Sequence, residues 1–183
     1  MDKEIEIRFI NLSREEIEKK LLAIGAARSG EFFFQEWIFA YPEWAKDNRR
    51  LRVRTDGKDT WLTYKANATW EIDSTEEIET TVSSAGGISK IVKAIGVPCL
   101  RYQEKKRIRY KLNDIVFELD FWPKIPMVFE IEAPSVEKVK EGAKLLNLDY
   151  SKAIFVDQKV LHKEYYNVDL DKVSDYRFTE KMR

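Results

Sequence analysis

Charged side chains in this sequence recur at every second position within short segments, and most segments carry charge of one sign. Arg50, Arg52 and Arg54 alternate with apolar residues, and Glu130 and Glu132 do so further along the chain. Residues two positions apart on a β-strand share a face at a spacing of about 6.5–7 Å, so each segment predicts a ladder of like charge. Guanidinium groups bind phosphate oxygens in bidentate fashion, and hard divalent cations prefer carboxylate oxygens. The spacing therefore predicts a site for a phosphate compound together with metal ions.

The full set of these charges is balanced between the two signs. Its acids are Glu4, Glu6, Glu77, Glu79, Glu118, Asp120, Glu130 and Glu132, and its bases are Arg8, Arg50, Arg52, Arg54, Lys65, Lys105, Arg107 and Arg109. For any one strand a solvated sheet face is the simpler interpretation, because antiparallel sheets are often polar on one side. For the whole set that interpretation is disfavoured, because like charges side by side cost energy and solvated faces mix signs. We predict that the sheet closes around these groups, and that a triphosphate with two divalent cations keeps the cavity nearly neutral.

The composition argues against several classes of protein. Lys and Arg total 32, as do Asp and Glu, so the basic excess expected of a nucleic-acid-binding protein is missing. Cys99 is the only cysteine, which excludes an internal disulfide and a multi-cysteine metal site. The charged N-terminal residues are unlike a signal peptide, and no stretch approaches the roughly 20 apolar residues of a membrane span. These features predict a cytoplasmic protein with neither nucleic acid nor membrane as a partner.

The hydrophobic pattern predicts one α+β domain. Alternation predicts strands at 4–10, 32–39, 49–55, 60–66, 76–82, 104–112, 115–121 and 127–132. Helical spacing and capping residues predict helices at 13–24, 84–95, 134–146 and 156–166. We predict a closed antiparallel eight-stranded β-barrel with a charged interior and helices packed outside. This domain covers residues 1–166, and residues 167–183 form a polar tail that is either an ordered flap or a disordered end.

The charged segments also resemble a known family in their order. Glu4-Ile5-Glu6-Ile7-Arg8 is similar to the N-terminal Glu-x-Glu-x-Lys signature of the CYTH superfamily, the triphosphate tunnel metalloenzymes. Further matches follow in the family's order: Leu51-Arg52-Val53-Arg54, Leu62-Thr63-Tyr64-Lys65, Glu77-Ile78-Glu79, Lys105-Lys106-Arg107, Leu119-Asp120 and Phe129-Glu130-Ile131-Glu132. The resemblance implies a tunnel with metal ions on an acidic wall and a triphosphate on a basic wall.

The resemblance also implies roles for individual residues. Ligands for Mg²⁺ or Mn²⁺ are expected at Glu4, Glu6, Glu77, Glu79, Asp120, Glu130 and Glu132. Phosphate contacts are expected at Arg8, Arg50, Arg52, Arg54, Lys65, Lys105, Arg107 and Arg109. Catalytic roles are expected at Glu4, Glu6, Lys65, Glu79 and Asp120.

The activity that the resemblance implies is metal-dependent hydrolysis of inorganic triphosphate, thiamine triphosphate or a nucleoside triphosphate. One alternative is a class IV adenylyl cyclase, which converts ATP to cyclic AMP and pyrophosphate. Another is a protein that binds polyphosphate or nucleotides without turnover. The expected partner is the small-molecule triphosphate, and the chain is expected to be a monomer or a homodimer.

Two departures from the family pattern bear on activity. Arg8 stands where the family usually has lysine, and because arginine does not deprotonate, a proton-transfer role there is in doubt. Trp37 and Phe39 stand near positions where members often have an acid and a tyrosine. These departures motivate the alternative in which the protein only binds its ligand.

Several other residues have a structural and a functional interpretation. His162 is the only histidine and is expected to be structural or on the surface, and Cys99 is expected to pack against apolar neighbours. Trp37 or Trp122 can touch an organic part of the substrate, although core packing is the more common role of such residues. Lys159 is expected either to close one mouth of the tunnel together with Tyr165 or to lie on a solvated helix face.

Overall fold

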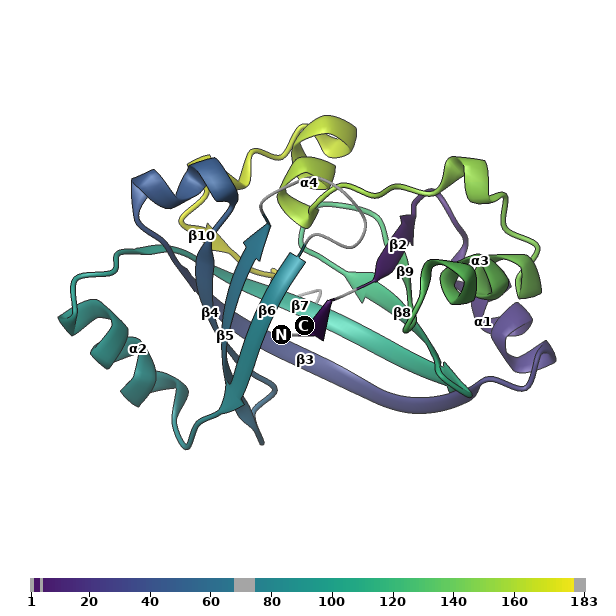
Figure 1. Ribbon diagram of the computed structural model, residues 1–183, viewed down its shortest axis with the longest axis horizontal. Helices are drawn as coiled ribbons and strands as arrows, with labels where there is room; N and C mark the ends of the chain where they lie inside the picture. The colour runs from purple at the N-terminus through teal and green to yellow at the C-terminus, as the bar shows by residue number, and fades with distance from the viewer. Residues whose placement is uncertain (1, 4, 68–74, 180–183) are drawn as a thin grey trace.

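The fold is an α+β arrangement in which helices flank one curved sheet (Figure 1). The computed structural model describes residues 2–3, 5–67 and 75–179. Its strands are β1 (Asp2–Lys3), β2 (Glu6–Phe9), β3 (Ala27–Phe39), β4 (Arg50–Thr55), β5 (Thr60–Asn67), β6 (Thr75–Thr81), β7 (Cys99–Leu112), β8 (Ile115–Phe121), β9 (Val128–Glu132) and β10 (Asp175–Tyr176). Its α-helices are α1 (Arg14–Ala23), α2 (Ala85–Ala94), α3 (Val136–Leu145) and α4 (Gln158–Tyr166), and its 3₁₀ turns are η1 (Pro42–Asp47), η2 (Tyr150–Lys152) and η3 (Leu170–Lys172).

The strands pair in the order β1-β6-β5-β4-β3-β7-β8-β9-β2, and β10 adds to β7. Every pair along this path is antiparallel, and only the β10 pairing is parallel. The two ends of the path, β1 and β2, belong to one N-terminal segment, which pairs with β6 through residues 2–3 and with β9 through residues 6–9. The sheet is therefore curved so strongly that β6 and β9 both pair with this N-terminal segment.

The sequence prediction is confirmed for the α+β class and the antiparallel sheet, and is corrected in two respects. Within the described residues, hydrogen bonds do not close the sheet into a barrel. The two strands at the ends of the pairing order, β1 and β2, are separate short stretches that do not pair with each other. Strands β3 and β7 are also longer than the predicted 32–39 and 104–112, and they pair along almost their whole length. The added stretches lack apolar alternation, so the sequence pattern does not reveal them. In Figure 1 these two strands run along the base of the sheet. They join one arm, made of β4, β5 and β6, to a second arm, made of β8, β9 and β2.

The hydrophobic core lies on the outer face of the sheet, beneath the helices. Ile17 and Leu21 of α1 and Val139 of α3 are buried with Ile108 and Ile131 in one cluster. A second cluster holds α2 against β3 and β4 through Val92, Phe39 and Val53. The predicted alternation, with apolar side chains outward and charged side chains inward, is therefore observed.

Residues just before α4 fasten this helix to β2 and β4. Ile154 forms a backbone bridge with Arg8 of β2, and Asp157 forms an ion pair with Arg50 of β4 at 3.1 Å. In Figure 1, α4 accordingly lies across the open side of the curved sheet.

The C-terminal residues 167–179 pack on the sheet. Tyr176 and Phe178 are buried, and the Phe178 backbone N–H donates to Glu104 Oε2 at 3.0 Å. In the described part of the chain, the helices are too short or too polar to cross a bilayer.

Candidate functional site

The curved sheet surrounds a partly open cavity of about 830 Å³ whose walls carry most of the predicted site residues. The predicted residues that line it are Glu6, Arg8, Arg50, Arg52, Arg54, Lys65, Glu77, Glu79, Lys105, Arg107, Arg109, Glu130 and Glu132. Asp120 and Glu118 are buried but do not line it, and Glu4 lies outside the described residues. The strand pattern therefore brings together residues that are up to 126 positions apart, from Glu6 to Glu132.

One end of the cavity is organised around the guanidinium group of Arg107. This group contacts three carboxylates: Asp120 at 2.5 Å, Glu130 at 2.8 Å, and Glu118. Lys105 Nζ reaches the same Asp120 at 3.0 Å. Asp120 is thus held behind the wall by two bases, which explains why it is not exposed in the cavity.

Mutual pairing keeps this cluster ionised despite its burial. Burial alone would raise the pKa of Asp120, but the charges of Arg107 and Lys105 outweigh it and hold that pKa far below its ordinary value. Burial likewise opposes the charge on Arg107, yet Asp120 and Glu118 raise its pKa well above normal. For Lys105, burial and the nearby Arg107 lower the pKa. The arrangement provides fixed charges that are shielded from bulk water, where electrostatic effects are strong.

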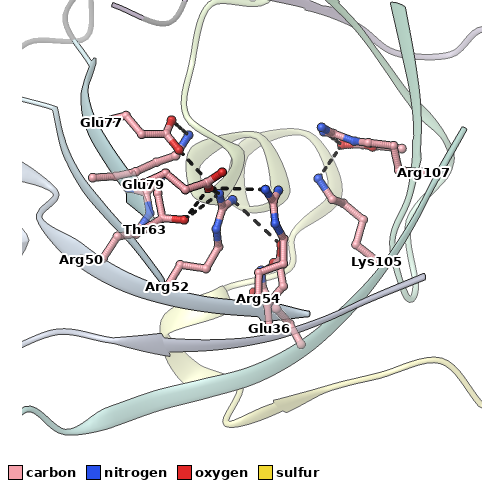
Figure 2. Close-up of polar contacts among 12 residues, drawn as sticks. Glu36, Arg50, Arg52, Arg54, Thr63, Glu77, Glu79, Lys105 and Arg107 are labelled. Atoms are coloured by element: carbon pink, nitrogen blue, oxygen red, sulfur yellow. Dashed lines mark hydrogen bonds and ion pairs between the residues drawn. The ribbon is translucent and has the colours of Figure 1, made fainter. Parts of the chain in front are cut away.

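A second cluster surrounds Arg52 in the other arm (Figure 2). Its guanidinium lies 3.6 Å from Glu79, 3.7 Å from Glu77 and 3.9 Å from Glu36. Arg54 donates to the same Glu79 at 3.4 Å, and Figure 2 shows both arginines extending toward it. Burial and the neighbouring Arg52 lower the pKa of Arg54 to about 10, so the group still carries its charge near neutral pH.

Lys65 and Thr63 of β5 complete this second cluster. Lys65 Nζ lies 2.7 Å from Glu77 Oε2, and the Thr63 hydroxyl donates to Glu79 Oε2 at 2.7 Å. These contacts fix the carboxylates of Glu77 and Glu79 on β6 from the adjacent strand.

Arg8 ties the N-terminal segment to the cavity wall. Its guanidinium donates to Glu130 Oε1 at 2.8 Å and to the Val156 carbonyl at 2.7 Å, and it contacts Glu6. Burial opposes its charge, but Glu6 and Glu130 outweigh burial and raise its pKa further. Arg8 therefore stays protonated, in line with the doubt about a proton-transfer role at this position.

Glu36 of β3 is a cavity residue that the sequence pattern missed. It is 1% exposed, accepts from Gln103 Nε2 at 2.5 Å, and has no hydrogen-bond partner for its Oε1 atom. Burial would raise its pKa, but Arg52, Lys105 and Arg54 outweigh burial and lower it. Glu36 has no second acid two positions away, because Phe34 and Ile38 stand there, so no ladder of like charge marked it in the sequence.

The face of β3 corrects the expectation for Trp37 and Phe39. Glu36 and Ile38 line the cavity, whereas Phe39 is buried in the α2 cluster with Trp37 packed against it. The acid expected near Trp37 is therefore present one position earlier, as Glu36, and no tyrosine from this stretch of β3 lines the cavity.

Other sequence interpretations are resolved by position. His162 is fully buried outside the cavity lining, and burial lowers its pKa to about 4, which confirms a structural role. Cys99 packs against the α2 cluster, as predicted. Trp122 and Lys159 line the cavity, whereas Tyr165 is exposed outside it.

The donor set suits a hard divalent cation. Carboxylate oxygens of Glu118, Asp120 and Glu130 lie within 4.8 Å of one another, and Glu6 and Glu132 lie on the cavity wall nearby. Oxygen-only donors of this kind match Mg²⁺ or Mn²⁺. In this structure the guanidinium of Arg107 contacts all three of these carboxylates. Lys105, Arg8 and Arg109 each contact one of them.

Comparisons with solved structures identify the fold. A Pyrococcus horikoshii protein is 22% identical over 93% of this chain and 99% of its own, with a TM-score of 0.74. A putative adenylate cyclase from Vibrio parahaemolyticus is 14% identical over 86% of this chain and 96% of its own, with a TM-score of 0.73. A putative adenylyl cyclase from Hippeastrum with a dominant triphosphatase activity is 17% identical over 93% and 99%, with a TM-score of 0.65.

These identities are low, so the likeness is one of fold. No curated protein matches the sequence. The family model for the CYTH domain, however, matches residues 2–162, which include all the charged strands of the cavity. Since this match spans most of the 183 residues, the chain belongs to the CYTH family.

Proposed function

We propose that this chain is a divalent-metal-dependent hydrolase of triphosphates. The observation that carries the proposal is the cavity of the curved sheet, which arginine and lysine ladders line together with carboxylate ladders. Triphosphatases and adenylyl cyclases are the activities that resemblance to the CYTH family implies, and both act on a metal-bound triphosphate. The fold of the solved relatives is consistent with either reaction.

The basic side chains are proposed to hold the phosphate chain. Arg52 and Arg54 of β4 lie opposite Lys105 and Arg107 of β7 across the strand β3. Each of these groups carries positive charge inside the cavity, where guanidinium forks can bind phosphoryl oxygens and offset the charge that develops during transfer.

The acidic side chains are proposed to hold Mg²⁺ or Mn²⁺, with Glu6, Glu130 and Glu132 on the wall and Asp120 behind it. Such an ion, when bound, neutralises phosphate charge and polarises the phosphorus–oxygen bonds. Glu79 and Glu36 lie beside the arginine ladder, and one of these carboxylates is proposed to accept a hydrogen bond from the water that attacks the terminal phosphorus.

The test replaces one residue from each wall. Glu132→Ala is expected to abolish phosphate release, because a metal ligand is lost. Arg54→Ala is expected to raise KM about tenfold or more, because a charge-assisted contact to phosphate is lost. Phosphate release from tripolyphosphate, ATP and thiamine triphosphate is measured with Mg²⁺ and with Mn²⁺.

Glu141→Ala on the exposed face of α3 is the matched control and should retain full activity. Full turnover by both Glu132→Ala and Arg54→Ala would refute the site. Cyclic AMP and pyrophosphate from ATP, in place of phosphate, would assign the cyclase alternative instead. Tight binding of every triphosphate without any product would assign the binding-only alternative.

A further inference from the structure

The carboxylate of Glu36 is held by a row of hydrogen bonds that begins in the C-terminal part of the protein. The Leu170 carbonyl, in η3, accepts from Arg101 Nη1 at 2.7 Å. Arg101 Nε donates to Gln103 Oε1 at 2.7 Å, and Gln103 Nε2 donates to Glu36 Oε2 at 2.5 Å. We call these four residues the Leu170–Glu36 chain.

The sheet brings the side chains of this chain together. Arg101 and Gln103 are two positions apart on β7, so their side chains leave the strand on the same face. Glu36 on β3 is the direct cross-strand partner of Gln103. All three side chains line the cavity and are buried, so bulk water competes little for their hydrogen bonds.

The chemistry of the groups allows the chain one direction only. A guanidinium group donates and does not accept, so Arg101 must meet the amide oxygen of Gln103. The amide nitrogen is then turned to Glu36, where it binds Oε2. Within the described residues, Glu36 Oε1 has no hydrogen-bond partner. The chain therefore determines which oxygen of Glu36 is engaged and which can still accept a hydrogen bond.

The outer end of the chain is anchored by the residues that follow α4. Strand β10 pairs with β7, and the backbone N–H of Tyr102 donates to the Ser174 carbonyl at 2.9 Å. Leu170 and Tyr176 are buried in one cluster with Trp122. These contacts hold the Leu170 carbonyl in place relative to β7. The match to the CYTH family model ends at residue 162, so this anchor lies beyond the matched part of the chain.

We propose that residues 168–179 take part in the chemistry of the cavity by holding the Glu36 carboxylate in place for the attacking water. Arg101 and Gln103 transmit this hold and are positioning residues. The inference rests on the proposed function, in which Glu36 is one of two acids that can serve the water. It predicts that the Leu170–Glu36 chain acts on turnover, and not on the binding of phosphate.

The test interrupts the chain at its two middle members. Arg101→Met and Gln103→Met keep a side chain of similar length but cannot form the hydrogen bonds. Each is expected to lower kcat about tenfold and to change KM less than about twofold, because a misplaced reacting group costs rate more than binding. Phosphate release from tripolyphosphate, ATP and thiamine triphosphate with Mg²⁺ is measured, and the fastest substrate is used.

A double-mutant cycle separates positioning from general damage to the structure. Arg101→Met added to Glu36→Gln is expected to lower kcat by less than about twofold further, because the carboxylate through which Arg101 acts is already lost. Leu170→Ala loosens the packing of η3 and is expected to lower kcat when Glu36 is present but not in the Glu36→Gln variant. Gln103→Met keeps the test decisive if Arg101→Met does not fold, which its melting temperature reveals.

Arg177→Met is the matched control, since Arg177 is exposed, pairs with Asp175 and lies outside the cavity lining. It should leave kcat and KM unchanged. Equal losses of kcat from Arg101→Met with and without Glu36 would overturn the inference while leaving the proposed hydrolase intact. A normal kcat with a KM raised about tenfold would also overturn it, because Arg101 would then bind phosphate itself.

Two further outcomes are decisive. A normal kcat in Leu170→Ala would show that the C-terminal residues do not hold Glu36, and this would overturn the inference. Failure of the unaltered protein to release phosphate from any of the three triphosphates, with no rise in melting temperature on adding them with Mg²⁺, would instead remove the proposed function and this inference with it.

Discussion

At the scale of single residues, Glu36 differs from the other acids of the cavity because it stands on the basic wall. Its carboxylate lies among Arg52, Arg54 and Lys105, the groups proposed to hold phosphate. A buried polar atom without a hydrogen-bond partner is rare in folded proteins, and its Oε1 atom is of this kind. This oxygen faces the Arg52 guanidinium at 3.9 Å, beyond hydrogen-bond distance, so it can still accept a hydrogen bond.

Glu36→Gln is expected to lower kcat about a hundredfold and to change KM little. The amide keeps the shape of the carboxylate but cannot orient and deprotonate an attacking water. Steady-state kinetics with the best triphosphate provides the measurement, and an unchanged melting temperature shows that the fold is intact. A raised KM with normal kcat would show that Glu36 only positions Arg52.

Asp157 permits a prediction about pH and stability. Burial raises its pKa, but Arg50 and the Lys159 backbone N–H outweigh burial and lower the value from 3.8 to about 2. Because the folded pKa is depressed, the stabilisation is fully present above pH 4 and is lost as the pH falls toward 2. The size of the shift corresponds to roughly 2 kcal/mol.

Asp157→Asn is therefore expected to lower the free energy of unfolding by roughly 2 kcal/mol at pH 7, with a deficit that shrinks between pH 4 and pH 2. Asparagine still caps α4, so the difference reports the charge and not the cap. Denaturant titrations across this pH range supply the measurement. A deficit that is independent of pH would contradict the prediction.

At the scale of elements, alternation was sufficient to predict the strands that carry ladders, but not the ends of β3 and β7 or the face of β3. In the aromatic stretch Phe32–Phe34, neighbouring residues are all apolar, so no alternation shows which side faces the cavity. The β3–β7 pairing also shifts register between Ile38 and Phe39. The order of the strands and the docking of the C-terminal residues depend on long-range packing, which a local pattern does not contain.

Gly142 shows how closely a helix approaches the sheet. A Cβ atom at this position of α3 would lie 2.9 Å from Ile131 Cγ2, closer than real Cβ contacts, and 3.2 Å from Ile115 Cγ2, which is a tight contact. Gly142→Ala is therefore expected to lower the free energy of unfolding by about 1 kcal/mol or more, since overpacking outweighs the gain in helix propensity.

Gly86→Ala on α2 is the control for this prediction, because the nearest atom to its added Cβ would be 4.0 Å away. It should leave stability unchanged or raise it slightly. Chemical denaturation of both variants provides the measurement. A stabilised Gly142→Ala variant would show that α3 is packed less tightly than described.

At the scale of the whole molecule, the cavity compensates its own charge. Arg107 and Arg52 each contact three carboxylates, so in the empty protein most ladder groups are partners of one another. An anion that takes the arginines leaves carboxylates without their partners, and a cation does the converse. Binding of one therefore favours binding of the other.

Mg²⁺ and tripolyphosphate added together are expected to raise the melting temperature by more than the sum of their separate effects. A coupling of about 1–3 kcal/mol is typical of linked sites and would be readily detected. Sodium chloride at matched ionic strength is the control. Additive shifts would show that the two sets of charges respond independently.

The N-terminal segment has a consequence for handling the protein. Residues 2–3 and 6–9 cover the exposed borders of β6 and β9, which are strands distant from each other in the pairing order. Deleting this one segment would uncover two edges at once, and uncovered edges are templates for intermolecular pairing. A chain that lacks residues 2–9 is therefore expected to aggregate.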